Sequence, residues 1–185
     1  MRSIGQAGIE LARPDLPKPG CRVMLVCGPP AAGKTTHIKE RASADDIVID
    51  FDAIARERGY GLNPPAEIVS ELLCIRNARL AALAGEPSTR VVWVALTAPS
   101  DSLRGWWCET LGVRPEDLIL LRPTRTELYR RIREDPERAH VRQLHYELVD
   151  HWFNRDRVND AGKAKGGCDE HGFPTDSLHP WRKSS

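Results

Sequence analysis

Eight consecutive residues, 28–35 (GPPAAGKT), constrain this chain more than any other segment, because they fit the pattern GxxxxGK[ST] at every specified position. An apolar run rich in β-forming residues, 22–27 (RVMLVC), comes directly before them, and a helix is predicted from about Lys34 to Ala42. Glycine lets the backbone turn tightly and approach an anion, and backbone N–H groups at the start of a helix face that anion. The segment therefore predicts a phosphate-binding loop between a strand and a helix.

The residues of this loop have separate expected roles toward a bound nucleoside triphosphate. We expect the ammonium group of Lys34 to reach the β- and γ-phosphate oxygens, and the hydroxyl group of Thr35 to bind Mg²⁺. ATP and Mg²⁺ are therefore the expected cofactors. The residues predicted to bind ATP are Gly28, Pro29, Pro30, Ala31, Ala32, Gly33, Lys34, Thr35 and Thr36.

Apolar runs alternate with helix-forming segments along residues 21–157. Predicted strands cover residues 22–27, 47–51, 91–96 and 118–121, and predicted helices cover about residues 34–42, 52–58, 64–83, 100–111, 124–134 and 136–154. The strands are almost wholly apolar, as expected for a parallel sheet that helices cover on both faces. We therefore predict an α/β domain with the three-layer P-loop NTPase fold and a parallel sheet of four to five strands. An irregular lead-in at 1–20 precedes it, and an extended C-terminal tail at 158–185 follows it.

Composition excludes several classes of protein. The 185 residues carry 27 Lys and Arg against 26 Asp and Glu, a formal net charge of +1. This excludes a protein that coats nucleic acid through bulk charge and leaves a local basic groove open. No apolar run approaches the ~20 residues of a membrane helix, and the first residues lack the pattern of a secretory signal. Five widely spaced cysteines without a CxxC pair favour a cytoplasmic protein with free thiols, in which Cys27 and Cys74 are buried.

Two segments, GPPAAGKTT (28–36) and VIDFDAIAR (48–56), together resemble the small P-loop kinases. They are most similar to the polynucleotide-kinase and zeta-toxin-like branch, which is often found in bacteriophages, and the resemblance covers about residues 22–157. It implies transfer of the γ-phosphate of ATP to a hydroxyl group, with a nucleic-acid 5′-hydroxyl as the first acceptor and a nucleotide or nucleotide-sugar as the next. For a phage-encoded protein, the expected compartment is the host cytoplasm.

Two carboxylates, Asp50 and Asp52, follow the second predicted strand. Strand alternation places them on the same side, with Phe51 opposite, at the end of the strand where open parallel sheets bind ligands. The resemblance implies that one of them orients the acceptor hydroxyl and accepts its proton, and Asp52 matches the family position better. The alternatives are a helix N-cap for Asp52 and a metal-side or hydrogen-bonded structural carboxylate for Asp50. Arg56, one helical turn after Asp52, resembles the arginine that orients the substrate.

Thr97 directly follows the third predicted strand, at the point where a standard Walker-B strand has an aspartate. This departs from motor ATPases and agrees with the resembling kinases, in which a small polar residue often stands at this point. Thr97 is therefore either a contact in the active site or an ordinary hydroxyl at a strand end. Trp106 and Trp107 follow on a predicted helix, where core packing is favoured over stacking on a nucleobase.

An arginine-rich segment follows the fourth predicted strand. Its seven arginines are Arg122, Arg125, Arg130, Arg131, Arg133, Arg138 and Arg142. Arginine suits planar, bidentate recognition of phosphate. Residues 128–138 (LYRRIREDPER) resemble the kinase lid, which implies that Arg131 and Arg138 close over ATP and stabilise charge on the transferring phosphoryl group. The alternative is a solvated helix face with pairs such as Glu127–Arg131.

The C-terminal tail carries Cys168, His171 and His179, which are metal-binding residue types at suggestive spacing. Structural zinc sites use four ligands, and the tail offers three N or S donors. The competing interpretation is therefore a tail whose HPW segment docks on the domain or on a protein partner.

Two functions follow from the sequence. The first is an ATP-dependent phosphotransferase that uses the residues named above. The second is a nucleotide-gated ATP-binding adaptor or ATPase that acts with a nucleic-acid enzyme partner, for which the missing strand-end aspartate and the unusual tail leave room.

Overall fold

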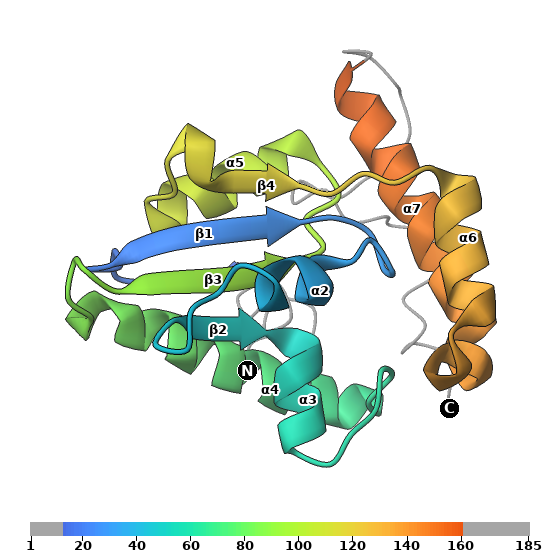
Figure 1. The fold of residues 1–185 in the computed structure, drawn as a ribbon, viewed down its shortest axis with the longest axis horizontal. Helices are drawn as coiled ribbons and strands as arrows, with labels where there is room; N and C mark the ends of the chain where they lie inside the picture. Colours follow the sequence, from blue (N-terminus) through green and yellow to red (C-terminus); the bar gives the residue numbers. More distant parts are fainter. Residues whose placement is uncertain (1–12, 161–185) are drawn as a thin grey trace, which may run out of the picture.

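A four-stranded parallel sheet forms the centre of the protein (Figure 1), as seen in a computed structural model that describes residues 13–160. Its strands are β1 (Arg22–Cys27), β2 (Ile47–Asp50), β3 (Val91–Leu96) and β4 (Leu118–Leu120). Their spatial order is β2-β3-β1-β4, and every pairing is parallel. The predicted α/β class with a parallel sheet is confirmed for the described residues, with four strands.

Helices connect the strands and continue after the last of them. The α-helices are α2 (Lys34–Lys39), α3 (Phe51–Glu57), α4 (Ala66–Ala82), α5 (Asp101–Leu111), α6 (Arg125–Glu134) and α7 (Arg142–Asp160). Short 3-10 helices are η1 (Leu83–Gly85), η2 (Pro115–Asp117) and η3 (Pro136–Val141). Within residues 13–160, no helix is both long and apolar enough to cross a lipid bilayer.

The ends of α5 show how local sequence sets an element. The hydroxyl group of Ser100 accepts a hydrogen bond from the backbone N–H of Leu103 (3.3 Å), which satisfies a donor that has no partner inside the helix. Gly112 adopts the left-handed conformation (φ 61°) that ends helices and that side chains disfavour. Ser100 and Gly112 therefore set the two ends of the helix predicted over about residues 100–111.

The predicted single helix over residues 136–154 is wrong, because the segment contains two helices. The carboxylate of Asp135 accepts a hydrogen bond from the backbone N–H of Glu137 (3.0 Å), and the backbone N–H of Arg138 donates to the carbonyl of Asp135 (3.1 Å). An i to i+3 bond of this kind is the 3-10 pattern, so η3 forms first and α7 begins at Arg142. α7 continues to Asp160, three residues past the predicted domain boundary at 157.

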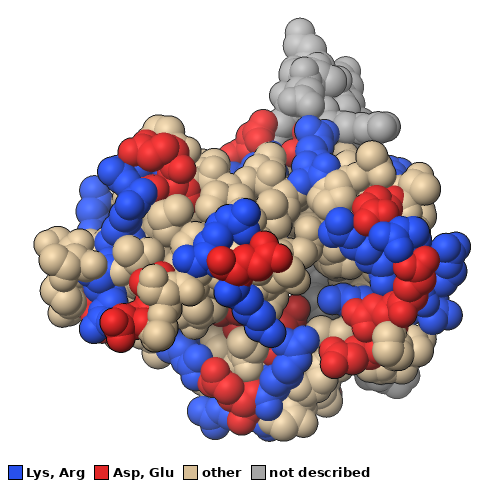
Figure 2. All heavy atoms as spheres, in the orientation of Figure 1, with Lys and Arg blue, Asp and Glu red and all other residues tan. Residues whose placement is uncertain are grey.

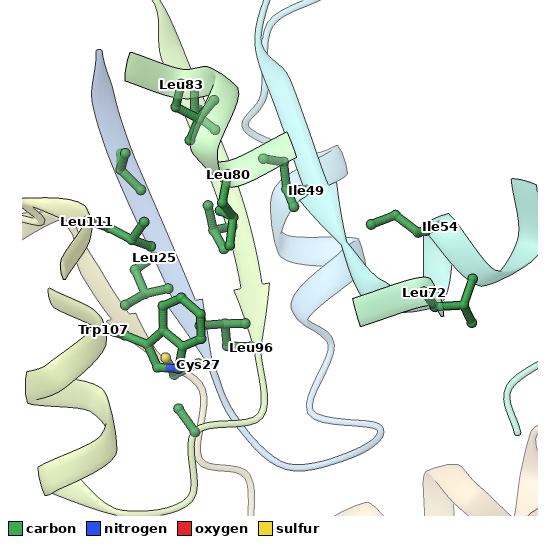
Figure 3. Packing of buried hydrophobic residues seen from close by; sticks show 14 of the residues in the cluster. Leu25, Cys27, Ile49, Ile54, Leu72, Leu80, Leu83, Leu96, Trp107 and Leu111 are labelled. Atoms are coloured by element: carbon green, nitrogen blue, oxygen red, sulfur yellow. The ribbon is translucent and has the colours of Figure 1, made fainter. Parts of the chain in front are cut away.

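The sheet is covered on both faces, and the face toward α4 and α5 carries the larger apolar cluster (Figure 3). Alternate residues of β1 and β3 point to this face and pack against Leu80 of α4 and Trp107 of α5. On the opposite face, Val26 and Trp93 pack against Ile38 of α2. Trp107 is 3% exposed, which confirms core packing as its role.

Cys74 is exposed, so its predicted burial is wrong, whereas Cys27 is buried as predicted. The buried residues of α4 are Leu72, Arg76 and Leu80, which follow each other at a spacing of one helical turn. Cys74 comes two residues after Leu72, a rotation of about 200° around the helix axis. It therefore points away from the sheet, although its neighbours in the sequence are apolar.

A second apolar cluster joins α6 and α7 to the loop between β1 and α2. Its buried members are Ala32, Leu128, Ile132, Val149, Trp152 and Phe153. Ala32 belongs to the predicted phosphate-binding loop, and the other residues lie on the two helices. The helices therefore pack on that loop at the carboxyl ends of the strands (Figure 1).

A buried ion pair holds α7 against the rest of the domain. Nη2 of Arg104, on α5, lies 2.7 Å from Oδ1 of Asp156, on α7, and each side chain is 4% exposed. The other oxygen of Asp156 lies 2.7 Å from Nη2 of Arg122. The indole N–H of Trp152 donates to the carbonyl of Thr97, after β3 (2.8 Å). These contacts fix the position of α7 over the ends of the strands.

Replacing Asp156 with alanine is expected to lower the free energy of unfolding by about 3 kcal/mol, because the buried guanidinium of Arg104 is left with a single carboxylate partner, the exposed Asp101. Urea unfolding followed by circular dichroism measures this change. Glu57→Gln is the matched control, since it breaks the exposed ion pair with Arg79 and should cost under about 1 kcal/mol. Equal losses in both variants would contradict the structural role given to the buried pair.

Candidate active site

The backbone of the loop between β1 and α2 requires glycine at both glycine positions of the motif. A Cβ atom on Gly28 would lie 2.5 Å from the carbonyl oxygen of Leu121 and 3.1 Å from the Cβ atom of Ala32. Gly33 has φ 94° and ψ 20°, a left-handed conformation, directly before the first residue of α2. The predicted strand–loop–helix arrangement around the motif is present, although α2 ends at Lys39 rather than at about Ala42.

Lys34 lies across this loop with its ammonium group bound to the backbone. Its Nζ atom donates to the carbonyl oxygens of Gly28 (2.8 Å) and Pro29 (2.9 Å). Burial lowers the pKa of this ammonium group, and the nearby carboxylates of Asp52 and Asp50 oppose that effect. Lys34, the predicted phosphate-binding lysine, is therefore held at the loop, where the charges of both candidate acids act on its ammonium group.

Thr35 and Asp50 form a polar contact that joins the loop to β2. The hydroxyl group of Thr35 donates to Oδ2 of Asp50 (2.8 Å). The other oxygen, Oδ1, accepts a hydrogen bond from the backbone N–H of Asp52 (3.0 Å), and the Asp50 side chain is buried. Asp50 is thus a hydrogen-bonded carboxylate beside the predicted Mg²⁺ ligand, one of the alternatives that the sequence left open.

The placement of Asp50 and Asp52 on one side of a strand is wrong, because β2 ends at Asp50 and Phe51 already begins α3. The Asp50 side chain caps α3 by accepting from an N–H two residues later, a bond that competes with continued strand pairing. The N-cap proposed for Asp52 therefore belongs to Asp50. Asp52 lies in the first helical turn, where its carboxylate has no capping role.

The carboxyl group of Asp52 is surrounded by charges from three other parts of the chain. Burial raises its pKa above the ordinary 3.8, and the neighbouring Asp50 raises it further. The positive charges of Lys34, Arg56 and Arg138 act in the opposite direction. The structure therefore brings the predicted base together with the loop lysine and with one of the two predicted lid arginines.

Arg131, the other predicted lid arginine, contacts the loop itself. Its Nη1 atom donates to the carbonyl oxygens of Ala31 (3.3 Å) and Ala32 (3.2 Å). Its Nε atom donates to Oε1 of Glu127 (2.7 Å), which is the i,i+4 pair that the sequence offered as an alternative role. One side of the guanidinium therefore faces the helix and the other faces the loop, while its predicted role over ATP stays a prediction.

Arg138 is held between a carboxylate and a histidine. Its Nε atom donates to Oδ2 of Asp135 (2.8 Å), and its Nη1 atom lies 2.9 Å from Nδ1 of His145. Sequence reasoning missed His145, which is buried on α7. The buried residues at 145, 149, 152 and 156 follow the spacing of one helix face, which is the signal that could have found it.

Arg56 lines a hollow of about 390 Å³ at the C-terminal end of α3. The hollow is lined by Arg56, Gly61, Leu62, Pro136, Glu137 and His140. Nη2 of Arg56 lies 3.9 Å from Oε2 of Glu137, so the guanidinium is partly balanced by an exposed acid. Thr97 is exposed after β3, and its carbonyl rather than its hydroxyl group makes the contact with α7. Thr97 therefore has a structural contact here, and its predicted place in the active site stays a prediction.

Positive charge at the site comes from a few placed side chains rather than from a basic surface. Across the face shown in Figure 2, Lys and Arg side chains alternate with Asp and Glu side chains. On α6, Arg130 pairs with both Glu127 and Glu134. These pairs neutralise much of the arginine-rich segment, which agrees with the net charge of +1 for the whole chain.

Oxygen donors suited to Mg²⁺ are present at the loop, in the hydroxyl group of Thr35 and the carboxylate of Asp50. Among residues 13–160, no group of three or more His, Cys, Asp or Glu side chains is arranged to hold a metal ion by itself. Mg²⁺ sites in phosphotransferases take only one or two protein ligands and complete the shell with phosphates and water. Cys168, His171 and His179, for which the sequence left a metal site open, lie outside the described residues.

The fold resembles that of a solved structure. No protein-family model and no curated protein matches this sequence. A chain of the Pnkp1/Rnl/Hen1 RNA repair complex superposes on 75% of this chain with a TM-score of 0.50 and 14% sequence identity. The present chain spans 47% of that chain, about half of its length. At this identity the likeness supports a shared fold alone.

Proposed function

We propose that this protein is a P-loop kinase that transfers the γ-phosphate of ATP to a hydroxyl acceptor, with a nucleic-acid 5′-hydroxyl as the first candidate. The observation that carries the proposal is the position of Asp52. Its raised pKa suits a base, and the positive charges of Lys34 and Arg138 act on its carboxyl group. The nucleic-acid acceptor comes from the sequence resemblance. The likeness in fold to a chain of an RNA repair complex is consistent with it.

In this proposal, the phosphates of ATP lie on residues 28–36, and the cationic side chains of the loop turn toward them. Lys34 exchanges its bonds to the carbonyls of Gly28 and Pro29 for bonds to the β- and γ-phosphate oxygens. Mg²⁺ would be held through the hydroxyl group of Thr35 with Asp50 beside it, and when bound it supplies neutralisation of phosphate charge. The glycines allow the backbone to approach the phosphates closely.

Asp52 acts on the acceptor rather than on ATP. Its carboxylate orients the acceptor hydroxyl and takes its proton while the hydroxyl oxygen forms a bond to the γ-phosphorus. The bond from the γ-phosphorus to the bridging oxygen breaks, and ADP leaves with the electron pair. Arg131 and Arg138 stabilise the negative charge on the transferring group, because each reaches the loop or the charges around it from the lid.

The acceptor enters from the hollow next to α3. Arg56 follows Asp52 by one turn of the helix and lines this hollow, so a phosphate of the acceptor strand can pair with its guanidinium. Its weak pairing with Glu137, at 3.9 Å, leaves the guanidinium available to such a phosphate.

A transfer assay with γ-labelled ATP tests the proposal. The acceptors are 5′-hydroxyl DNA, 5′-hydroxyl RNA, nucleosides and UDP-sugars, each with Mg²⁺. We expect label on the 5′-hydroxyl oligonucleotides and its loss with Lys34→Ala and with Asp52→Asn. Label on a nucleoside or a sugar alone would keep the kinase and replace the acceptor, and transfer to none of them would overturn the proposal.

The adaptor function has one structural observation in its favour. Both Lys34 and Arg131 are bonded to carbonyl oxygens of the loop, an arrangement that nucleotide binding would have to open. A protein gated in this way would couple ATP binding to a change at α6, without transfer. ATP binding with no labelled product and with unchanged behaviour of Asp52→Asn would favour this second function.

A further inference from the structure

Two different groups hold the guanidinium of Arg138, a cation whose charge acts on the candidate base. Its side chain is 17% exposed, and the carboxylate of Asp135 binds its Nε atom at 2.8 Å. The imidazole of His145 lies 2.9 Å from its Nη1 atom. The charge of Arg138 acts on both Asp52 and Lys34, which are the proposed base and the proposed phosphate-binding lysine.

The chemistry of the guanidinium fixes the tautomer of the histidine. A guanidinium group has only donors, so the contact requires Nδ1 of His145 to accept the hydrogen bond. A neutral imidazole with a free Nδ1 carries its proton on Nε2. His145 therefore serves Arg138 as a neutral acceptor.

We propose that His145 is a positioning residue, which aims Arg138 at the transferring phosphate through a neutral hydrogen bond. This inference rests on the proposed kinase function. A second carboxylate at this position would fix the guanidinium equally well but would cancel the positive charge that Asp135 already reduces. A neutral acceptor fixes the direction of the guanidinium and preserves its charge for the ligand. Within the described residues, Nη2 of Arg138 makes no hydrogen bond, so this nitrogen is free for a phosphate oxygen.

The surroundings of His145 keep it neutral at physiological pH. The pKa of its imidazole is lowered to about 4, chiefly by burial and next by the charge of Arg138, on η3. His140, also on η3, and Lys34, on the loop, act in the same direction, while Asp135, at the end of α6, opposes them. The acceptor nitrogen is therefore available to Arg138 throughout the range in which a kinase works.

Two substitutions of His145 distinguish the effect of its hydrogen-bond acceptor from the effect of its side-chain volume. His145→Asn places an amide oxygen close to the former Nδ1 position, and His145→Leu fills the site without an acceptor. A hydrogen bond to a charged group corresponds to about tenfold to a hundredfold in rate, so His145→Leu should lower kcat by that factor. His145→Asn should recover most of the loss. Thermal unfolding of both variants monitors stability, and equal kcat values in two folded variants would overturn the inference.

A double-substitution cycle shows whether His145 acts through Arg138. In the Arg138→Gln background, His145→Leu should cause less than a twofold further loss of kcat, because the group it positions is already absent. A tenfold further loss in that background would mean that His145 acts elsewhere, and the inference would fail.

Nuclear magnetic resonance gives a readout that needs no activity. The six histidines of the chain are labelled with ¹⁵N, and His145 is assigned by its absence in His145→Asn. We expect the Nε2–H tautomer at neutral pH and an apparent pKa well below 6.5, which rises in Arg138→Gln as the positive neighbour is removed. Titration near 6.5 that is the same in both proteins would overturn the inference. A chain that passes this test but transfers no phosphate would instead contradict the proposed function.

Discussion

Lys34→Ala is expected to lower phosphate transfer by about a thousandfold, because the alanine leaves the β- and γ-phosphate oxygens without their main protein cation in a partly buried site. Steady-state kinetics with ATP as the varied substrate measures the change, and we expect kcat to fall and KM for ATP to rise. Lys39→Ala is the matched control: Lys39 is exposed at the end of the same helix, so its loss should change neither value by more than about twofold.

The pH dependence of the same reaction carries a second signature of Lys34. Burial lowers the pKa of its ammonium group, so the charge is lost at a lower pH than the 10.5 of an ordinary lysine. The alkaline limb of kcat/KM should therefore begin below that of an exposed lysine, and it should be absent in the residual activity of Lys34→Ala. Full activity of Lys34→Ala would show that the loop does not bind the phosphates of the donor.

The sequence predicted the bounds of an element correctly where neighbouring residues alone determine its ends. The third strand, Val91–Leu96, was predicted to the residue, because an apolar run is visible without the fold. The helix predicted over about residues 100–111 is present as α5, Asp101–Leu111. The strand predicted over residues 47–51 was one residue too long. Its end is set by Asp50, whose side chain bonds to Asp52 and to Thr35, and the second of these contacts exists only once the loop has folded against β2.

In the candidate site, too, the local motif was predicted from the sequence and the contacts between distant segments were not. The motif at 28–35 predicted the loop, and its glycines have the conformations and the close contacts that the motif requires. The partners that give each cation its direction come from distant segments: Arg131 binds the carbonyl of Ala31, a hundred residues away, and Arg138 binds His145 on another helix. No spacing rule along the chain encodes such contacts, since they depend on how α6 and α7 pack on the loop.

Asp52→Asn is expected to lower kcat by about a hundredfold to ten-thousandfold while KM for ATP changes little, because the amide cannot accept the proton of the acceptor hydroxyl. The raised pKa of Asp52 also predicts the acid limb of the rate profile. Activity needs the ionised carboxylate, so it should fall, as the pH decreases, at a higher pH than an aspartate of pKa 3.8 would give. This limb should disappear in Asp52→Asn, and an unchanged kcat in that variant would exclude Asp52 as the base.

Asp50→Asn is the matched comparison, because of the two variants only Asp50→Asn should be less stable than the parent protein. A carboxyl group whose pKa is raised on folding is ionised at a cost in the folded state, so the free energy of unfolding at neutral pH should be unchanged or higher in Asp52→Asn. The carboxylate of Asp50 instead accepts hydrogen bonds from Thr35 and from the first turn of α3, and Asp50→Asn should lower the free energy of unfolding by about 1–2 kcal/mol. Urea unfolding of both variants measures this difference. Asp52 is thus expected to lower the stability of the fold while it serves the reaction, and Asp50 is expected to hold β2, α3 and the loop together. If Asp52→Asn were instead the less stable variant, the roles of Asp50 and Asp52 would be exchanged.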